Sequence, residues 1–209
     1  MRYYPSINHF KLSKPHILTI GVFDGVHLGH QFLLKQLTTL AKNHNWQSTV
    51  LTFDQHPTNV LNPNQPVKLI FDLESKIRLL QAQNIDNLIV QPFTQNFANL
   101  TATEFVNQIL VQKLQISAIL ITPNFRFGKN KQGDARMLTT LAKNFSFQVF
   151  SAKMYSYQDQ IVSSSLIRQL LADGRQLEAK FLLGHQQNYN QKDNSKCLRS
   201  LCRITNPKR

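Results

Sequence analysis

The chain has 209 residues, a formal net charge of +13 and 42% apolar residues, enough for one sizeable core. No run of about 20 apolar residues could cross a membrane, and the first ten residues lack the apolar stretch of a secretory signal. Because Cys197 and Cys202 are the only cysteines, a disulfide framework is excluded. We therefore expect a cytoplasmic protein with no membrane partner.

The charge comes from 24 basic residues against 11 acidic ones. Such an excess suits nucleic acid or small polyanions such as nucleotides, but a lysine-rich surface without any partner accounts for it equally well. Six Lys and Arg residues face only Asp193 after residue 185, where helical periodicity also disappears. We expect a domain over residues 1–185 and a weakly ordered basic tail over residues 186–209.

Short apolar runs alternate with helical patterns along the first 185 residues. Strands are expected at His16–Phe23, Ser48–Phe53, Asn87–Phe93, Ala118–Thr122 and Phe147–Ala152. Helices are expected at Gly29–Asn43, Leu73–Gln83, Ala102–Leu114, Ala135–Asn144, Ser164–Ala172 and Gln176–Leu183. Thr101 and Glu104 have the spacing of a capping box, and Gly174 and Gly184 stand where helices should end. Apolar strands that alternate with helices predict an α/β fold, a doubly wound parallel sheet that binds ligands beyond its carboxyl edge.

The segment Gly21–His30, with the sequence GVFDGVHLGH, directly follows the first expected strand. Its glycines allow close approach of the backbone, and N–H groups at a helix start attract anions. His27 and His30 could donate hydrogen bonds to phosphate oxygens. The glycine spacing matches neither the dinucleotide fingerprint nor the Walker motif, and no third metal ligand accompanies the histidines. We interpret the segment as a phosphate-binding turn rather than a metal site or a pair of core histidines.

A second motif, Thr52–Pro57, ends the second expected strand. Phe53 and His56 could face a flat aromatic substrate there, although an ordinary strand exit accounts for them equally well. A third motif, Asn124–Lys129, places an arginine between two phenylalanines, so that a planar ring could stack while the cation meets phosphate. Taken alone, it also resembles a loop that binds nucleic acid, but no other segment repeats the pattern.

The fourth motif is Ser163–Arg168, at the start of an expected helix. Serine hydroxyls there cap the helix and can also bind an anion, and Arg168 lies within reach of the same point. An N-cap alone would explain the serines. Their function as an anion site depends on whether the fold brings them to His27 and His30.

Together the four motifs resemble the FMN adenylyltransferase (FAD synthetase) module of the bacterial bifunctional riboflavin kinase/FAD synthetases. The resemblance runs from about His16 to His185, and includes Gln31 and the closing segment Phe181–His185. The spacing of His27, Gly29 and His30 alone is shared by a broad nucleotidyltransferase superfamily. The resemblance implies a Rossmann-like nucleotidyltransferase fold and the reaction of ATP with FMN to give FAD and pyrophosphate, with Mg²⁺ accompanying ATP.

The chain departs from the family pattern at three places. Gln55 stands where the family usually has proline, and Ser165 stands where it usually has threonine. After His185 the basic tail replaces the β-barrel riboflavin kinase domain, so we expect no kinase activity. The tail is either a natural ending or the remnant of a truncated or frame-shifted gene.

The resemblance also implies roles for individual residues and leaves the metal ligands unknown. The expected catalytic residues are His27, His30, Asn124 and Arg168. ATP is expected at Gly21, Phe23, Asp24, Gly25, Gly29, Ser163 and Ser164. FMN is expected at Phe53, Pro57, Phe125, Arg126 and Phe127. ATP and FMN are thus the expected partners, and nucleic acid is not.

Three alternatives remain open at the level of sequence. One is another nucleotidyltransferase that acts on NMN, pantetheine phosphate or glycerol phosphate. Another is a non-catalytic basic protein that binds nucleic acid with steep salt dependence. The third is an inactive remnant that keeps the motifs but binds ATP poorly.

Overall fold

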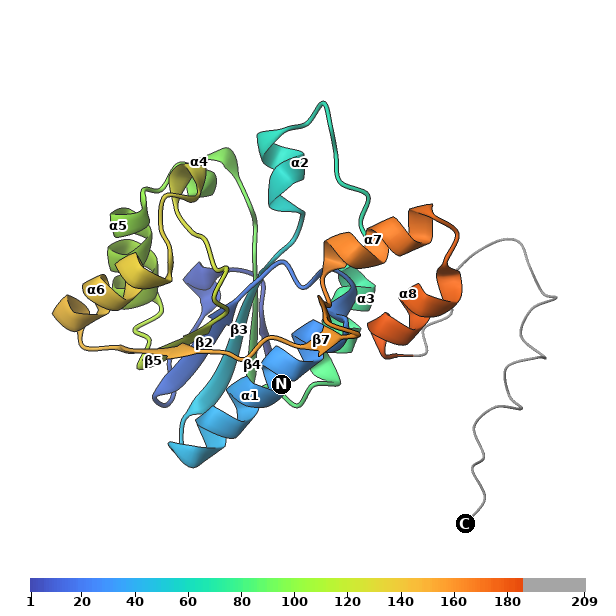
Figure 1. Ribbon diagram of the computed structural model, residues 1–209. Helices are drawn as coiled ribbons and strands as arrows, with labels where there is room; N and C mark the ends of the chain where they lie inside the picture. Colours follow the sequence, from blue (N-terminus) through green and yellow to red (C-terminus); the bar gives the residue numbers. More distant parts are fainter. Residues whose placement is uncertain (186–209) are drawn as a thin grey trace, which may run out of the picture.

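The computed structural model describes residues 1–185, with a six-stranded parallel sheet at its centre (Figure 1). The strands are β1 (Arg2–Tyr4), β2 (His16–Ile20), β3 (Gln47–Phe53), β4 (Asn87–Gln91), β5 (Ala118–Ile121) and β6 (Gln148–Ser151). Their order across the sheet is β1-β4-β3-β2-β5-β6, and every neighbouring pair is parallel. This confirms the expected doubly wound α/β fold. The expected basic tail lies outside the described residues.

Neighbouring strand residues point to opposite sides of the sheet. Because both sets are apolar here, helices cover both faces. Ile17 packs with α1 (Leu28–Asn43) and α3 (Leu73–Gln81). Leu18, the next residue, packs on the other face. That face is covered by α5 (Ala102–Glu104), the π-helix η3 (Phe105–Lys113) and α6 (Ala135–Phe145). Two separate apolar layers therefore hold the sheet rigid between them.

A third, smaller core lies beyond the carboxyl edge of the sheet. It is formed by α7 (Ser164–Ala172) and α8 (Gln176–Leu183), orange to red in Figure 1, which pack against Ile70 and Val162. The antiparallel hairpin of β7 (Ser156–Tyr157) and β8 (Gln160–Ile161) leads into this pair of helices. Gly174 and Gly184 follow α7 and α8 with positive φ angles of 74° and 69°, as expected for helix ends.

The structure differs from the sequence expectations mainly in short elements. Strand β1 and the helices α2 (Pro57–Leu61) and α4 (Gln95–Ala98) are too short to show a period. The expected helix over residues 102–114 is present, but most of it is π-helical, with Leu114 N donating to Ile109 O. The expected strand over residues 16–23 stops at Ile20, because the backbone turns sharply afterwards. Among the described residues no helix is long and apolar enough to span a membrane.

The capping box at the start of α5 should contribute measurably to stability. Thr101 Oγ1 accepts from Glu104 N, and the Glu104 carboxylate accepts from Thr101 N at 2.8 Å. Thr101→Ala removes the cap and should lower the free energy of unfolding by about 1 kcal/mol in urea denaturation. Thr139→Ala, an exposed threonine inside α6, is the control and should not destabilise the protein. Equal stabilities of the two variants would contradict a role for the cap.

Candidate active site

The segment after β2 has an unusual backbone. Phe23, Gly25 and Val26 have φ angles of 52°, 82° and 39°. Glycine adopts such angles readily, but phenylalanine and the β-branched valine do so only at an energetic cost. Phe23 is fully buried, so its side chain anchors the turn while only its backbone can face a ligand. The turn must therefore be held by other contacts.

Those contacts are hydrogen bonds to the carbonyl groups of Val22–Val26. One side-chain donor, Gln31, lies nearby in the sequence, and the others come from elements far along the chain. They are Thr52 Oγ1 and Lys76 Nζ to Val22 O, Ser164 Oγ to Asp24 O, His185 Nε2 to Gly25 O, and Gln31 Nε2 to Val26 O. Within the described chain the N–H groups of Val22 and Phe23 have no acceptor. The turn thus keeps N–H groups available for an anion.

His27 and His30 stack on each other at the start of α1. Their ring centroids are 3.7 Å apart, and Phe23 packs on His30 at 5.0 Å. His27 is the N-cap, and its Nδ1 accepts from His30 N at 3.3 Å, which leaves the proton on Nε2. The Nδ1 atom of His30 is buried and has no hydrogen-bond partner among the described residues. A buried polar atom without a partner is a group that a ligand can satisfy.

Both imidazoles are neutral in the free protein. Burial, together with the charges of Arg168 and His185, lowers the pKa of His27 from 6.5 to about 3. Burial and the neighbouring charges of His27 and Lys76 also hold the pKa of His30 well below its usual value. The surroundings thus disfavour additional positive charge at this point.

The start of α7 meets the start of α1. A side chain at Gly29 would come within 2.7 Å of Val162 O, so only glycine permits this approach. Arg168 of α7 forms a 2.7 Å ion pair with Asp24, which is only 3% exposed. The other carboxylate oxygen of Asp24 accepts from Ile70 N. The structure therefore brings the first and fourth motifs together, with Asp24 as the link between them.

The second and third motifs lie on loops at the same carboxyl edge. Phe53 and Phe127 are only 8% and 7% exposed, so their rings belong to the core rather than to an open stacking surface. Phe125 is half-buried and stacks on Phe127 at 5.6 Å. These rings belong to one row of aromatic contacts, through Phe53, Phe97, Phe105, Phe127 and Phe125.

The remaining residues of these two motifs have different surroundings. Asn124 and Arg126 are exposed, and Asn124 Oδ1 accepts from Thr122 Oγ1 at 2.8 Å. Pro57 is the first residue of α2, and His56 caps that helix by accepting from Thr58 N. Burial and the charge of Arg168 lower the pKa of His56, and His56 lines the same small cavity as Val22 and Asp24 of the turn after β2.

The sequence interpretation missed Lys76 and gave His185 no role at the site. Both side chains donate to the phosphate turn, Lys76 to Val22 O and His185 to Gly25 O. A lysine three residues after Leu73 in an otherwise apolar helix face was the available signal for Lys76. No local signal connects His185 to Gly25, because that contact joins opposite ends of the domain.

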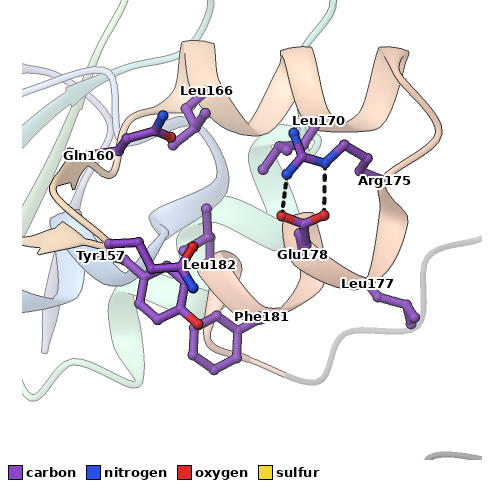
Figure 2. A pocket seen from close by; sticks show the side chains of 10 residues that line it. Tyr157, Gln160, Leu166, Leu170, Arg175, Leu177, Glu178, Phe181 and Leu182 are labelled. Atoms are coloured by element: carbon purple, nitrogen blue, oxygen red, sulfur yellow. Dashed lines mark hydrogen bonds and ion pairs between the residues drawn. The ribbon is translucent and has the colours of Figure 1, made fainter.

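A cavity of about 460 Å³ lies on the far side of α7, between α7, α8 and the β7–β8 hairpin (Figure 2). Tyr157 and Phe181 pack together on one side of it, and Arg175 and Glu178 are paired across two hydrogen bonds. Of the residues that line it, Leu166 alone belongs to one of the four motifs. The motif residues Asp24 and His56 instead line a cavity of about 10 Å³ with Lys76.

Comparison with known proteins agrees with this arrangement. The family model for FAD synthetase matches residues 9–166, which include the first three motifs and most of the fourth. The chain belongs to the FAD synthetase family. The family predicted from the motifs is thus confirmed.

Several relatives are identical to this chain at about a third of the aligned positions. A bifunctional riboflavin kinase/FMN adenylyltransferase of Haemophilus influenzae is 38% identical over 80% of this chain and 54% of its own length. One from Buchnera aphidicola is 33% identical over 83% of this chain and 56% of its own length. The chain therefore spans about half the length of the curated relatives it matches.

A solved structure also supports the fold. A crystal structure of a protein named as a macrolide-efflux protein, from Streptococcus pneumoniae, superimposes with a TM-score of 0.74 at 26% identity. It covers 87% of this chain, and the matched part is 60% of that protein. The Rossmann-like architecture is thus shared well beyond the motifs.

Because these histidines are buried and neutral, we expect the free energy of unfolding to fall in acid. Because the pKa of His27 is about 3 in the folded chain and about 6.5 when unfolded, only the unfolded chain binds this proton between those values. The free energy of unfolding should fall as pH drops below 6.5, by up to about 1.4 kcal/mol per pH unit for this group. Urea denaturation at pH 7, 6 and 5 gives the free energy of unfolding at each pH, and its dependence on pH should be shallower for His27→Gln than for the wild type. His9→Gln, an exposed histidine, is the control, and equal slopes for all three proteins would contradict the burial of a neutral His27.

Proposed function

We propose that this protein transfers the adenylyl group of ATP to FMN, giving FAD and pyrophosphate. The observation that carries the proposal is the meeting of two helix starts, those of α1 and α7, around a turn whose carbonyls all accept hydrogen bonds. N–H groups at helix starts favour anions, and two such starts at one point suit a triphosphate. Family membership supports the same reaction.

The reaction is an in-line attack by the FMN phosphate on the α-phosphorus of ATP. A P–O bond forms between the FMN phosphate oxygen and the α-phosphorus, and the bond to the bridging oxygen of pyrophosphate breaks. Because both substrates are anions, catalysis consists mainly of positioning and of charge stabilisation. The protein needs no covalent nucleophile for this reaction.

In this proposal His27 and His30 donate hydrogen bonds to the triphosphate and to the charge that develops at the α-phosphorus. A neutral imidazole carries one N–H, and binding beside phosphate raises its pKa and can add the second. Gly21 and Gly25, with the backbone of Phe23, lie on the ATP side, and Gly29 contributes by letting the start of α7 approach the start of α1. The hydroxyl of Ser163, the backbone N–H of Ser164 and Arg168 bind the β- and γ-phosphates, and Asp24 holds Arg168 in place at 2.7 Å.

The acceptor side is formed by the second and third motifs. Phe125, half-buried, is the ring best placed to contact the isoalloxazine, while Phe53 and Phe127 support it from the core. Pro57 and the exposed Arg126 line the same loops, and Asn124 orients the attacking phosphate. The alternative acceptors are NMN, pantetheine phosphate and glycerol phosphate, and each can replace FMN in the assay described below.

Mg²⁺ is proposed as part of the MgATP substrate. Among residues 1–185 no three His, Cys, Asp or Glu side chains are grouped so that they could hold a metal ion. Mg²⁺ typically keeps several waters and binds substrate phosphates with few protein ligands, so the neutral oxygens of Thr122 and Asn124 fit an outer position. When bound with ATP, the ion neutralises phosphate charge.

The proposal predicts FAD from purified protein incubated with ATP, Mg²⁺ and FMN, measured by chromatography. His30→Ala should lower the rate by about 10²–10³ because it removes a donor to the developing charge. His9→Ala, at an exposed histidine, should keep the wild-type rate. Circular dichroism should show that both variants are folded.

Two results would contradict the proposal. One is the absence of FAD with folded wild-type protein while another acceptor releases pyrophosphate. The other is wild-type turnover by folded His30→Ala. A parallel incubation with riboflavin in place of FMN should give no FAD, because no kinase step is proposed.

A further inference from the structure

Lys76 of α3 is buried at the point where two substrate loops begin. Only 7% of the residue is exposed. Its Nζ donates to Phe53 O at 2.6 Å and to Val22 O at 3.3 Å. Phe53 ends β3 and starts the acceptor-side loop, and Val22 lies in the phosphate turn after β2. One side chain thus connects the backbones of the two loops.

The charge of Lys76 has no direct counter-ion. Among the described residues its nitrogen takes part in no ion pair. Two carboxylates affect the charge of Lys76, and Asp24 has the larger effect. Asp24 is already paired with Arg168. Asp54 Oδ1 accepts hydrogen bonds from the N–H groups of Gln55 and Phe93. Burying a cation without a partner is costly, whereas methionine of similar size could fill the same space. Packing alone therefore does not explain a lysine here.

We propose that Lys76 is a positioning residue that fixes the spacing between the phosphate turn and the acceptor loop and supplies a buried positive charge for the two anionic substrates. The inference rests on the proposed function and names a residue that the four motifs do not contain. Because the ammonium group holds carbonyls on both loops, its loss changes the site for ATP and for the acceptor together.

The groups around Lys76 support this role. Asp24 on η2 (Asp24–Val26) and Asp54 after β3 favour its charged form, while His30 on α1 and His56 before α2 feel its charge. Burial is the largest influence and lowers the pKa of Lys76 to about 8. The ammonium is therefore charged at neutral pH and loses its charge just above it.

The first test compares Lys76→Met with Lys35→Met, an exposed lysine on α1. Lys76→Met should lower kcat/KM for both ATP and FMN by roughly 10- to 100-fold, since small displacements of reacting groups cost this much. It should also weaken binding of ATP alone, while the midpoint of urea unfolding stays close to that of the wild type. Lys35→Met should match the wild type in every measurement.

The second test uses Lys76→Arg, which keeps the charge but does not titrate below pH 12. The wild-type pH profile of kcat/KM should fall above about pH 8, and this alkaline limb should move to higher pH in Lys76→Arg. A purely structural lysine would not change the limb.

The inference is overturned if folded Lys76→Met keeps wild-type kcat/KM and ATP affinity, or if Lys76→Arg retains the wild-type alkaline limb. It is also overturned if Lys76→Met loses activity only in proportion to unfolding. Absence of FAD from the wild-type protein would refute the proposed function instead, and in that case ATP affinity alone decides the role of Lys76.

Discussion

The site depends on one constraint, namely that every carbonyl of Val22–Val26 accepts a hydrogen bond. Left-handed φ angles at Phe23 and Val26 cost of order 1–3 kcal/mol each. Each hydrogen bond contributes about 0.5–1.5 kcal/mol, so several together offset that strain. Side-chain donors come from β3, α1, α3, α7 and His185, two residues after α8. The N–H groups of Val22 and Phe23 have no acceptor within the described chain, so the turn can bind an anion without breaking these bonds, which is the preorganisation that phosphate chemistry needs.

Charge and burial are balanced at this point of the molecule. Cationic groups such as Arg168 and Lys76 surround imidazoles that burial keeps neutral. Asp24 compensates Arg168 directly. Positive charge therefore exceeds negative charge beside neutral groups that lack hydrogen-bond partners. Such surroundings favour a ligand that brings several negative charges. This agrees with the assignment to the FAD synthetase family.

The fold and the family could be predicted from the sequence. The fold depends on the short periods of apolar residues, and the family depends on short motifs. Apolar strands such as Ala118–Ile121 and the capping box of Thr101 are local signals, and the structure contains both. The π-helical winding after Glu104 and the three-residue strand β1 carry no such signal. The roles of Lys76 and His185 depend on contacts between residues tens of positions apart, which no spacing rule reveals. Burial of Phe127 likewise follows from its packing on Phe105, not from its loop sequence.

The hydrogen bond from His185 to Gly25 joins the last described residue to the turn that follows β2. Gln31 strengthens this connection, since its amide donates to both Val26 O and Leu183 O. The position of His185 is therefore coupled by a single hydrogen bond to the backbone of the Val22–Val26 turn. A shift of the segment Leu183–His185 would therefore also disturb the backbone of the turn.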